Sequence, residues 1–357
     1  MRAYNFSAGP STLPLDVLKE AQRDLLDFAN TGMSVTEISH RNKAFSQIVE
    51  EGESLLRELL QIPDDYAVLF VQGGASTQFA AVPLNLMHNG KADYVVTGNF
   101  AKKAFEEGKI YGDAACVASS ADQTYTYIPD LTQIPFRKGT DYVHICSNNT
   151  IFGTRYIDFP QTETPLVADM SSEILSREID VRRFGVIYAG AQKNLAPAGV
   201  TLVIAKRSLI QNPLGICPTM LQWKVQDENG SLYNTPPCFS IYVAVLVLRK
   251  LKQMGGIAAI NEINEYKAGL LYDFIDNSKF YTNNVVKKYR SIMNVPFVTP
   301  NAELDDAFLK GAAKEGLVSL KGHRLVGGMR ASIYNAMPVE GVKSLIGYMK
   351  KFEKDNA

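Results

Sequence analysis

Hydrophobic positions follow two periodicities along the first two thirds of the chain. Residues 15–29 and 43–60 carry apolar side chains at helical spacing, which predicts two amphipathic helices. Short apolar runs separated by helical stretches come next, and they predict buried strands at 67–71, 93–97, 142–145, 166–168, 186–189 and 202–204. Strands that alternate with helical crossovers are typical of an α/β unit with a mostly parallel sheet.

The pattern changes at about residue 242. A long helical pattern runs through residue 271 and contains a break at Gly255 and Gly256. It is followed by a predicted strand at 293–298, a helix at 304–314, a strand at 329–333 and a final helix with apolar positions between 339 and 352. This mixture predicts an α+β tail. We therefore predict an N-terminal arm at 1–15, a large domain at 16–245 and a small C-terminal domain at 246–357.

Length, charge and cysteine spacing narrow the class of protein. A chain of 357 residues favours two domains, since a single core rarely grows so large. The 37 basic residues balance 37 acidic ones without a long basic run, so we expect neither nucleic acid nor a membrane as partner. The N-terminus lacks the apolar segment of a secretory signal, and the four cysteines form no CxxC pair. A cytoplasmic protein without a metal site is expected.

Polar and aromatic groups follow several predicted strands at their ends. The strand at 67–71 leads into a glycine turn at 72–77 (QGGAST) and then a helix, an arrangement that binds phosphate through backbone amides. Phe100 follows the next strand, where a planar cofactor could stack on its ring, and Thr150 lies in a polar cluster after the strand at 142–145. Taken alone, each of these features more often serves the packing of the fold than the binding of a ligand. Together they predict one site, because ligands of open α/β sheets bind beyond the carboxyl ends of the strands.

A lysine and an aspartate indicate the chemistry of this site. Lys193 has small or apolar neighbours throughout the stretch 186–201 (VIYAGAQKNLAPAGVT), and Asp169 ends the apolar run at 166–168. Burial lowers the pKa of a lysine, so that its free amine can act as nucleophile and base. Pyridoxal phosphate (PLP) requires a lysine for its Schiff-base link and an acid beside the pyridine nitrogen. Asp169 alone could equally cap a helix, but the pair predicts a PLP site.

Nearly the whole chain resembles the phosphoserine aminotransferases, class V PLP enzymes of fold type I. The matching segments are 5–10 (NFSAGP), 39–41 (SHR), 73–79 (GGASTQF), 168–172 (ADMSS), 190–194 (GAQKN), 234–237 (NTPP), 321–324 (KGHR) and 327–337 (GGMRASIYNAM). The resemblance implies a large domain whose mostly parallel, seven-stranded sheet is sandwiched by helices, and a smaller α+β C-terminal domain. It also implies reversible amino transfer between glutamate and 3-phosphohydroxypyruvate in serine biosynthesis. Formation of 4-phosphohydroxythreonine in vitamin B6 biosynthesis is a further expectation.

The resemblance also implies roles for individual residues. Lys193 would carry the cofactor and move protons, and Asp169 would pair with the ring nitrogen. Further cofactor contacts are implied for Ala75, Ser76, Phe100, Thr150 and Gln192, and, from the neighbouring subunit of a homodimer, for Asn234 and Thr235. Arg330 would bind the α-carboxylate of the substrate. The distal phosphate or γ-carboxylate would meet His40, Arg41, His323 and Arg324. Many members have Trp in place of Phe100 and some have Arg in place of Ser76, so both positions could alter cofactor affinity.

Three alternatives remain at this point. An alanine–glyoxylate-type transaminase would not need the histidine–arginine pairs at 40–41 and 323–324. A cysteine desulfurase would need a cysteine in a flexible loop, and none of the four cysteines has glycine- and serine-rich flanks of that kind. A non-catalytic PLP-binding protein would be expected to have lost Lys193 or Asp169, and both are present.

Overall fold

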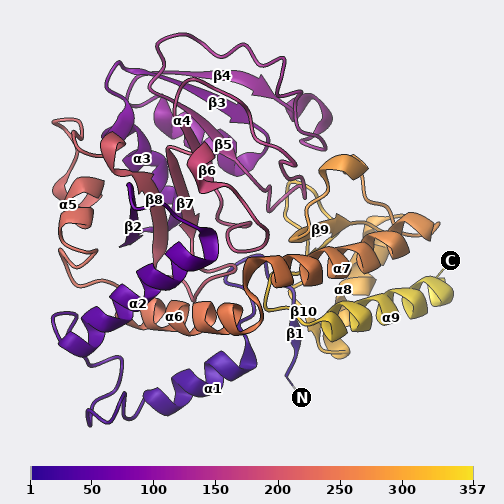
Figure 1. Ribbon diagram of the computed structural model, residues 1–357. Helices are drawn as coiled ribbons and strands as arrows, with labels where there is room; N and C mark the ends of the chain where they lie inside the picture. Colours follow the sequence, from indigo (N-terminus) through magenta and orange to yellow (C-terminus); the bar gives the residue numbers. More distant parts are fainter. Residues whose placement is uncertain (1, 357) are drawn as a thin grey trace.

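The large domain is built on one seven-stranded sheet with the strand order β2-β8-β7-β6-β5-β3-β4 (Figure 1). A computed structural model describes residues 2–356. The strands of this sheet are β2 (Tyr66–Val71), β3 (Lys91–Val96), β4 (Asp113–Ser119), β5 (Tyr142–Cys146), β6 (Leu166–Asp169), β7 (Val186–Gly190) and β8 (Thr201–Lys206). β8 pairs antiparallel with β2 and β7, and the other neighbouring strands pair in parallel. The predicted mostly parallel sheet is confirmed.

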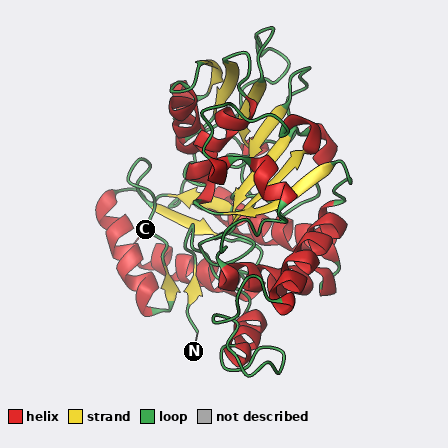
Figure 2. Cartoon of the chain, turned by 90° about the vertical axis from the view of Figure 1, so that its left-hand side faces the viewer, coloured by secondary structure: helices red, strands yellow, loops and turns green. Residues whose placement is uncertain are grey.

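Helices cover both faces of this sheet, as Figure 2 shows. Alternate residues of β2 point to opposite faces: Val68 and Phe70 join the core under one set of helices, whereas Ala67 and Leu69 join the core under the other. The first set contains α1 (Leu15–Asp24), α2 (Lys43–Leu60) and α6 (Cys238–Gln253). The second contains α3 (Gly74–Leu86), α4 (Asn99–Gly108) and α5 (Trp223–Glu228). Burial on both faces explains why the strands are continuous apolar runs.

Two sequence predictions about the large domain need correction. The helix predicted at 15–29 ends at Asp24, because the chain turns out of helical geometry and both Ala29 and Asn30 have positive φ angles (53° and 58°). The edge strand β4 was not predicted. Its residues are small or polar and only partly buried, so it lacks the apolar run that marks the central strands. By contrast, α2 has the predicted limits, and the side chain of Asn42 caps its N-terminus by accepting the N–H of Ala44.

The small domain has its own apolar core beneath three helices. Its elements are α7 (Gly256–Asn277), α8 (Ala302–Lys314), α9 (Val339–Asn356), the antiparallel pair β9 (Asn294–Phe297) and β11 (Met329–Ser332), and the parallel pair β1 (Tyr4–Asn5) and β10 (Leu317–Val318). Elsewhere in the chain and before β9, short 3-10 turns lie at 121–123, 181–183, 207–209, 219–221 and 287–289.

The predicted boundary at 245/246 falls inside α6. Residues of α7 up to Ile260 still join the core of the large domain, and those from Ala268 join the core of the small one. The domain limits therefore stay a prediction.

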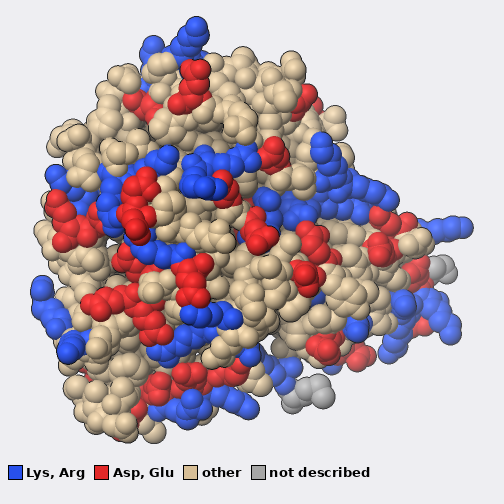
Figure 3. Space-filling view, in the orientation of Figure 1, with Lys and Arg blue, Asp and Glu red and all other residues tan. Residues whose placement is uncertain are grey.

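The surface shows no single dominant charge. On the face drawn in Figure 3, lysines and arginines are interspersed with aspartates and glutamates, in keeping with a formal net charge of zero. Within residues 2–356, every helix is too short or too polar to pass through a bilayer.

Candidate active site

The predicted site residues lie at one edge of the large sheet. β2, β3, β5, β6 and β7 run in the same direction, so the segments that follow them leave the sheet on the same side. Asp169 ends β6, and the segments after the other strands carry Ala75, Ser76, Phe100, Thr150 and Lys193, which were predicted for the site. The topology therefore brings the chemistry-bearing segments together, as expected for an α/β sheet.

Lys193 lies in the turn after β7, and its amine faces two of the other predicted residues. Its Nζ donates a hydrogen bond to Oγ1 of Thr150 at 2.8 Å and lies 5.5 Å from the centroid of the Phe100 ring. Burial lowers the pKa of Lys193, and the positive charge of Arg330 acts in the same direction, whereas the charge of Asp169 opposes the shift. The amine is thus held in one place and is more easily deprotonated than an exposed lysine.

The carboxyl group of Asp169 is buried and fixed by one serine. The backbone N–H and the hydroxyl of Ser171 both donate to Oδ1 of Asp169, at 2.9 and 2.6 Å. The same hydroxyl accepts the N–H of Gly190, at the end of β7, at 3.0 Å. Burial raises the pKa of Asp169, while Lys193 and Ser171 oppose that shift. A buried acid of this kind gains from a cationic partner such as a protonated ring nitrogen, so Asp169 fits the position predicted for it.

The glycine turn before α3 is shaped for a close backbone approach. Gly73 has a φ of +90°, and a Cβ atom there would lie only 2.0 Å from Oγ1 of Thr77. This hydroxyl donates to the carbonyl of Gly73 at 2.9 Å. Ala75 and Ser76 lie in the first turn of α3, where backbone N–H groups have no partner within the helix. These free donors and the helix dipole suit a phosphate group.

Asn234 and Thr235 lie beside this turn within the same chain. Nε2 of Gln72 donates to the carbonyl of Thr235 at 3.4 Å. Asn234 lines a cavity of about 180 Å³ together with Gln72, Gly73 and Thr77. The glycine turn therefore borders a concave, partly polar surface. The predicted contact of these two residues with a neighbouring subunit stays a prediction.

Arg330 of β11 reaches the site from the small domain. Its Nη1 donates to the carbonyl of Thr150 at 3.2 Å. Its Nε is buried and has no hydrogen-bond partner among the described residues. Burial lowers the pKa of this guanidinium, although an arginine remains charged at any physiological pH. A half-buried guanidinium with free donors next to Lys193 suits a carboxylate ligand.

The N-terminal arm closes over the lysine turn. The backbone N–H of Ser11 donates to the carbonyl of Gln192 at 2.9 Å, and its hydroxyl donates to the carbonyl of Lys193. Tyr334 of the small domain donates its hydroxyl proton to the carbonyl of Ala8 at 2.8 Å. The arm therefore ties the turn that carries Gln192 and Lys193 to the small domain.

Several cations from the small domain and from α4 lie near His323. Burial lowers the pKa of His323, and the positive charges of Arg330, Arg324 and Lys103 lower it further, so these groups act on one another at short range. Nζ of Lys103 lies 5.9 Å from the centroid of the Phe100 ring. Arg324 is exposed and accessible to a ligand. The arrangement favours substrates with a distal anionic group.

His40 and Arg41 are not part of this group within one chain. They lie on the segment before α2, and within residues 2–356 they make no hydrogen bond or ion pair with the residues around Lys193. His40 is partly buried with Nε2 lacking a partner among the described residues, and Arg41 is exposed. Their predicted role in substrate binding stays a prediction.

Comparison with known proteins places these features in a family. The family model for class-V aminotransferases matches residues 3–345. The chain belongs to the class-V aminotransferase family. It is 57% identical to a phosphoserine aminotransferase of Bacillus cereus over 357 residues, which covers 99% of both proteins.

Solved structures extend this likeness to three dimensions. The phosphoserine aminotransferase from Bacillus circulans subsp. alkalophilus superposes with a TM-score of 0.98 at 45% identity, covering 100% of this chain and 99% of the other. A PLP-bound phosphoserine aminotransferase from Trichomonas vaginalis superposes with a TM-score of 0.94 at 38% identity, covering 98% of this chain and 100% of the other. The aminotransferase fold predicted from the sequence is confirmed, and the residues of the site fit PLP on their own chemistry.

Two residues of this class-V aminotransferase site were not identified from the sequence. Ser171, which holds Asp169, was given no role. A serine two residues after an aspartate is a local signal for a side-chain to backbone turn, so this contact was within reach. Lys103 gave no such signal, since it lies one helical turn after Phe100 in an otherwise ordinary amphipathic helix.

Proposed function

We propose that this chain is a PLP-dependent phosphoserine aminotransferase that moves an amino group reversibly between glutamate and 3-phosphohydroxypyruvate, as required for serine biosynthesis. The observation that carries the proposal is the pair formed by the partly buried Lys193 and the buried Asp169, each held by a hydroxyl, from Thr150 and Ser171 respectively. The 57% identity to a phosphoserine aminotransferase over the full length supports the choice of substrate.

The residues divide the work of amino transfer. Bound PLP supplies an electron-withdrawing ring that stabilises negative charge at the substrate Cα. Asp169 would hold the ring nitrogen in its protonated form, and Phe100 would cover one face of the ring. Nζ of Lys193, with its lowered pKa, would take the proton from the substrate Cα and hold it for the next step. Thr150 would hold that nitrogen in place through its hydroxyl.

Selection of the substrate would depend on anions at its two ends. Arg330 would bind the α-carboxylate, because its guanidinium is only partly buried and its Nη2 has no hydrogen-bond partner among the described residues. His323, Arg324 and Lys103 would attract the phosphate of phosphoserine or the γ-carboxylate of glutamate. A substrate without a distal anion, such as alanine, leaves these cations without a partner. The cation group therefore favours phosphoserine over an alanine–glyoxylate-type reaction.

Cys146, the cysteine near Lys193, is not suited to the alternative cysteine desulfurase reaction. Cys146 ends β5 close to Asp169 and Lys193, and burial raises its pKa well above that of a free cysteine. A buried, protonated thiol on a strand is a poor nucleophile. This supports amino transfer as the reaction of the site.

The proposed enzyme is a homodimer with sites at the subunit interface. His40 and Arg41 lie outside the Lys193 group in one chain, and the segment before them exposes Leu26 and Met33 (84% and 38% exposed). Exposed apolar side chains on the segment that leads to His40 and Arg41 support a contact with a second copy of the chain.

Mixed dimers test this arrangement. Lys193→Ala and Arg41→Ala are each expected to be nearly inactive with phosphoserine. If Arg41 acts in the partner's site, refolding the two variants together restores roughly a quarter of wild-type activity, since half of the dimers are mixed and each has one intact site. No recovery in mixed dimers would place Arg41 in its own chain's site and refute this part of the proposal.

Two broader assignments accompany the proposal. The four free cysteines support a reducing compartment, in keeping with a cytoplasmic enzyme.

A second substrate also fits the cations of the site. Because 4-phosphohydroxythreonine has the same two anionic ends as phosphoserine, the same cations support its formation in vitamin B6 biosynthesis. Purified enzyme with glutamate and each keto acid in turn tests both substrates. Failure to form phosphoserine from 3-phosphohydroxypyruvate would refute the main assignment, whatever the outcome with the longer substrate.

A further inference from the structure

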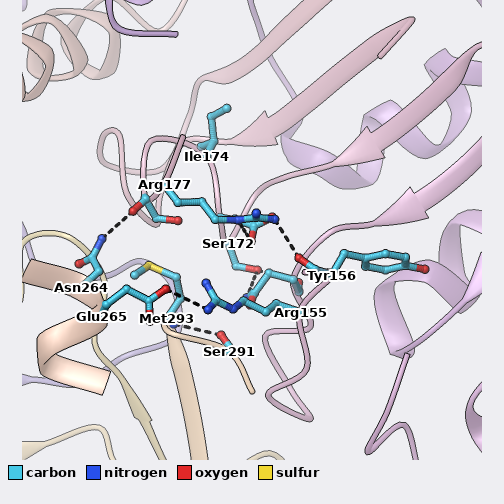
Figure 4. A network of polar contacts seen from close by, with 12 residues as sticks. Arg155, Tyr156, Ser172, Ile174, Arg177, Asn264, Glu265, Ser291 and Met293 are labelled. Atoms are coloured by element: carbon cyan, nitrogen blue, oxygen red, sulfur yellow. Dashed lines mark hydrogen bonds and ion pairs between the residues drawn. The ribbon is translucent and has the colours of Figure 1, made fainter. Parts of the chain in front are cut away.

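Three consecutive backbone carbonyls after β6 are each bound by the side chain of a different asparagine. The segment 170–176 turns sharply away from Asp169, and Leu175 within it has a φ of +64°. The carbonyls of residues 174, 175 and 176 accept hydrogen bonds from the Nδ2 atoms of Asn194, Asn335 and Asn264, at 3.0, 2.8 and 3.0 Å respectively. Figure 4 shows Asn264 pointing from α7 toward this segment.

The asparagines come from three separate parts of the chain and bind one another. Asn194 directly follows Lys193, Asn335 lies between β11 and α9, and Asn264 is in α7. Oδ1 of Asn194 accepts the backbone N–H of Asn335 at 3.0 Å, and Oδ1 of Asn335 accepts from Nδ2 of Asn264 at 2.9 Å. Asn194 and Asn264 are buried, so these bonds are shielded from water. We call the three side chains the asparagine clamp.

A buried lysine fixes the small-domain side of the clamp. Lys267 lies one turn after Asn264 in α7, and its Nζ donates to the carbonyls of Ile333, Tyr334 and Met337 at 3.1, 2.9 and 3.0 Å. All three N–H donors of an ammonium group are thereby used. Burial lowers the pKa of Lys267 to about 7, and carbonyl oxygens, not a carboxylate, surround it. The turn that carries Asn335 is therefore held from both sides.

The clamp joins the three segments that carry the key groups of the proposed site. The bound carbonyls begin five residues after Asp169, Asn194 adjoins Lys193, and Asn335 lies five residues after Arg330. The large domain supplies Asp169 and Lys193, whereas the small domain supplies Arg330. Amide side chains suit this task because they can both donate and accept. Asn194 and Asn335 do both, whereas Asn264 donates two hydrogen bonds and its Oδ1 has no partner among the described residues.

We propose that Asn194, Asn264 and Asn335 are positioning residues that set the distance between Arg330 and the pair formed by Lys193 and Asp169. The proposal rests on the proposed aminotransferase function. A substrate held by its α-carboxylate must present Cα to Lys193, and a displacement of about 1 Å can lower a rate by about a hundredfold. The clamp acts on catalysis through Arg330, without touching the substrate.

The test uses the holoenzyme and the variant Asn335→Ala, with Asn261→Ala as the matched control. Asn261 lies on the same helix as Asn264, and its Oδ1 has no hydrogen-bond partner among the described residues. Asn335→Ala is expected to lower kcat/KM for phosphoserine by at least about tenfold, with a lower kcat because Cα is displaced from Lys193, whereas the control stays within about twofold of the wild type. A lower melting temperature with unchanged kinetics would show a purely structural role and overturn the proposal.

A double-mutant cycle identifies the route of the effect. In an Arg330→Ala background, Asn335→Ala should lower kcat/KM by less than about threefold further, because the group that the clamp positions is already missing. Fully additive losses would overturn the proposal. If Asn335→Ala does not fold, Asn264→Ala, which removes the bonds to Ser176 and Asn335, replaces it in the same cycle with the same two outcomes.

Failure of the proposed function would be recognised separately. If the unaltered enzyme does not accept phosphoserine, the substrate assignment is wrong. The clamp is still tested with any amino acid that the enzyme does accept, because every such substrate has the α-carboxylate that Arg330 would bind.

Discussion

Replacement of Ser171 by alanine tests whether Asp169 is held ready for the cofactor. The change removes the 2.6 Å hydrogen bond from the hydroxyl to Oδ1 and leaves the backbone bond from the N–H of residue 171 in place. A hydrogen bond to a charged group contributes about 1.5–3 kcal/mol. Since Asp169 must be ionised beside a protonated ring nitrogen, we expect PLP to bind about ten- to a hundredfold more weakly.

The same substitution also affects stability. The hydroxyl of Ser171 accepts the N–H of Gly190, so its loss leaves a buried donor without a partner, at a cost of about 1–3 kcal/mol. Ser172→Ala is the matched control. Its hydroxyl is equally buried but bonds only to Asn148, donating to the carbonyl at 2.9 Å and accepting from Nδ2 at 2.8 Å. It should cost similar stability without changing the affinity for PLP.

Two measurements separate these effects. Titration of each apoenzyme with PLP, followed by the visible band of the lysine-bound cofactor, gives the dissociation constant. Urea denaturation gives the free energy of unfolding. The reasoning is refuted if both alanine variants bind PLP equally weakly, or if Ser171→Ala binds it as tightly as the wild type.

Three further changes test other parts of the site. Gly73→Ala should weaken PLP binding sharply or prevent folding of the turn, because the φ of Gly73 is +90° and the new Cβ would meet Thr77. Unchanged PLP affinity in a titration would contradict a role of this turn in binding the cofactor phosphate. Arg324→Ala should raise KM for phosphoserine by about tenfold or more while leaving that for alanine nearly unchanged, and equal effects on both would remove Arg324 from phosphate binding. The rate of PLP attachment to the apoenzyme should rise with pH and level off below about 10.4, since the pKa of Lys193 is lowered. Asp169→Asn should move that plateau to lower pH, because the charge that raises the lysine pKa is gone; a shift to higher pH would contradict this electrostatic account.

Periodicity in the sequence was sufficient for the buried part of the fold. The central strands are unbroken apolar runs because helices cover both faces, and α2 carries its own cap at Asn42. The edge strand β4 is only partly buried and was missed for that reason. The end of α1 at Asp24 was also missed, since apolar spacing continues as far as Phe28 although the chain has already left the helix.

Part of the candidate site could likewise be predicted from local sequence patterns, and part depends on contacts between distant segments. Lys193, Asp169 and the glycine turn are visible locally, because each follows an apolar run that marks a strand. The asparagine clamp has no such mark: Asn194, Asn264 and Asn335 are 70 or more residues apart in sequence and meet only through tertiary packing. Long-range polar contacts of this kind require the folded chain.

A single-turnover comparison of phosphoserine and serine tests the central claim most directly. Each amino acid is mixed with the PLP-loaded enzyme, and loss of the visible band of the lysine-bound cofactor is followed by stopped-flow spectroscopy. We expect phosphoserine to react at least about a hundredfold more efficiently, because only its phosphate can pair with the cations around His323 and Arg324. Equal or faster reaction with serine would contradict the account.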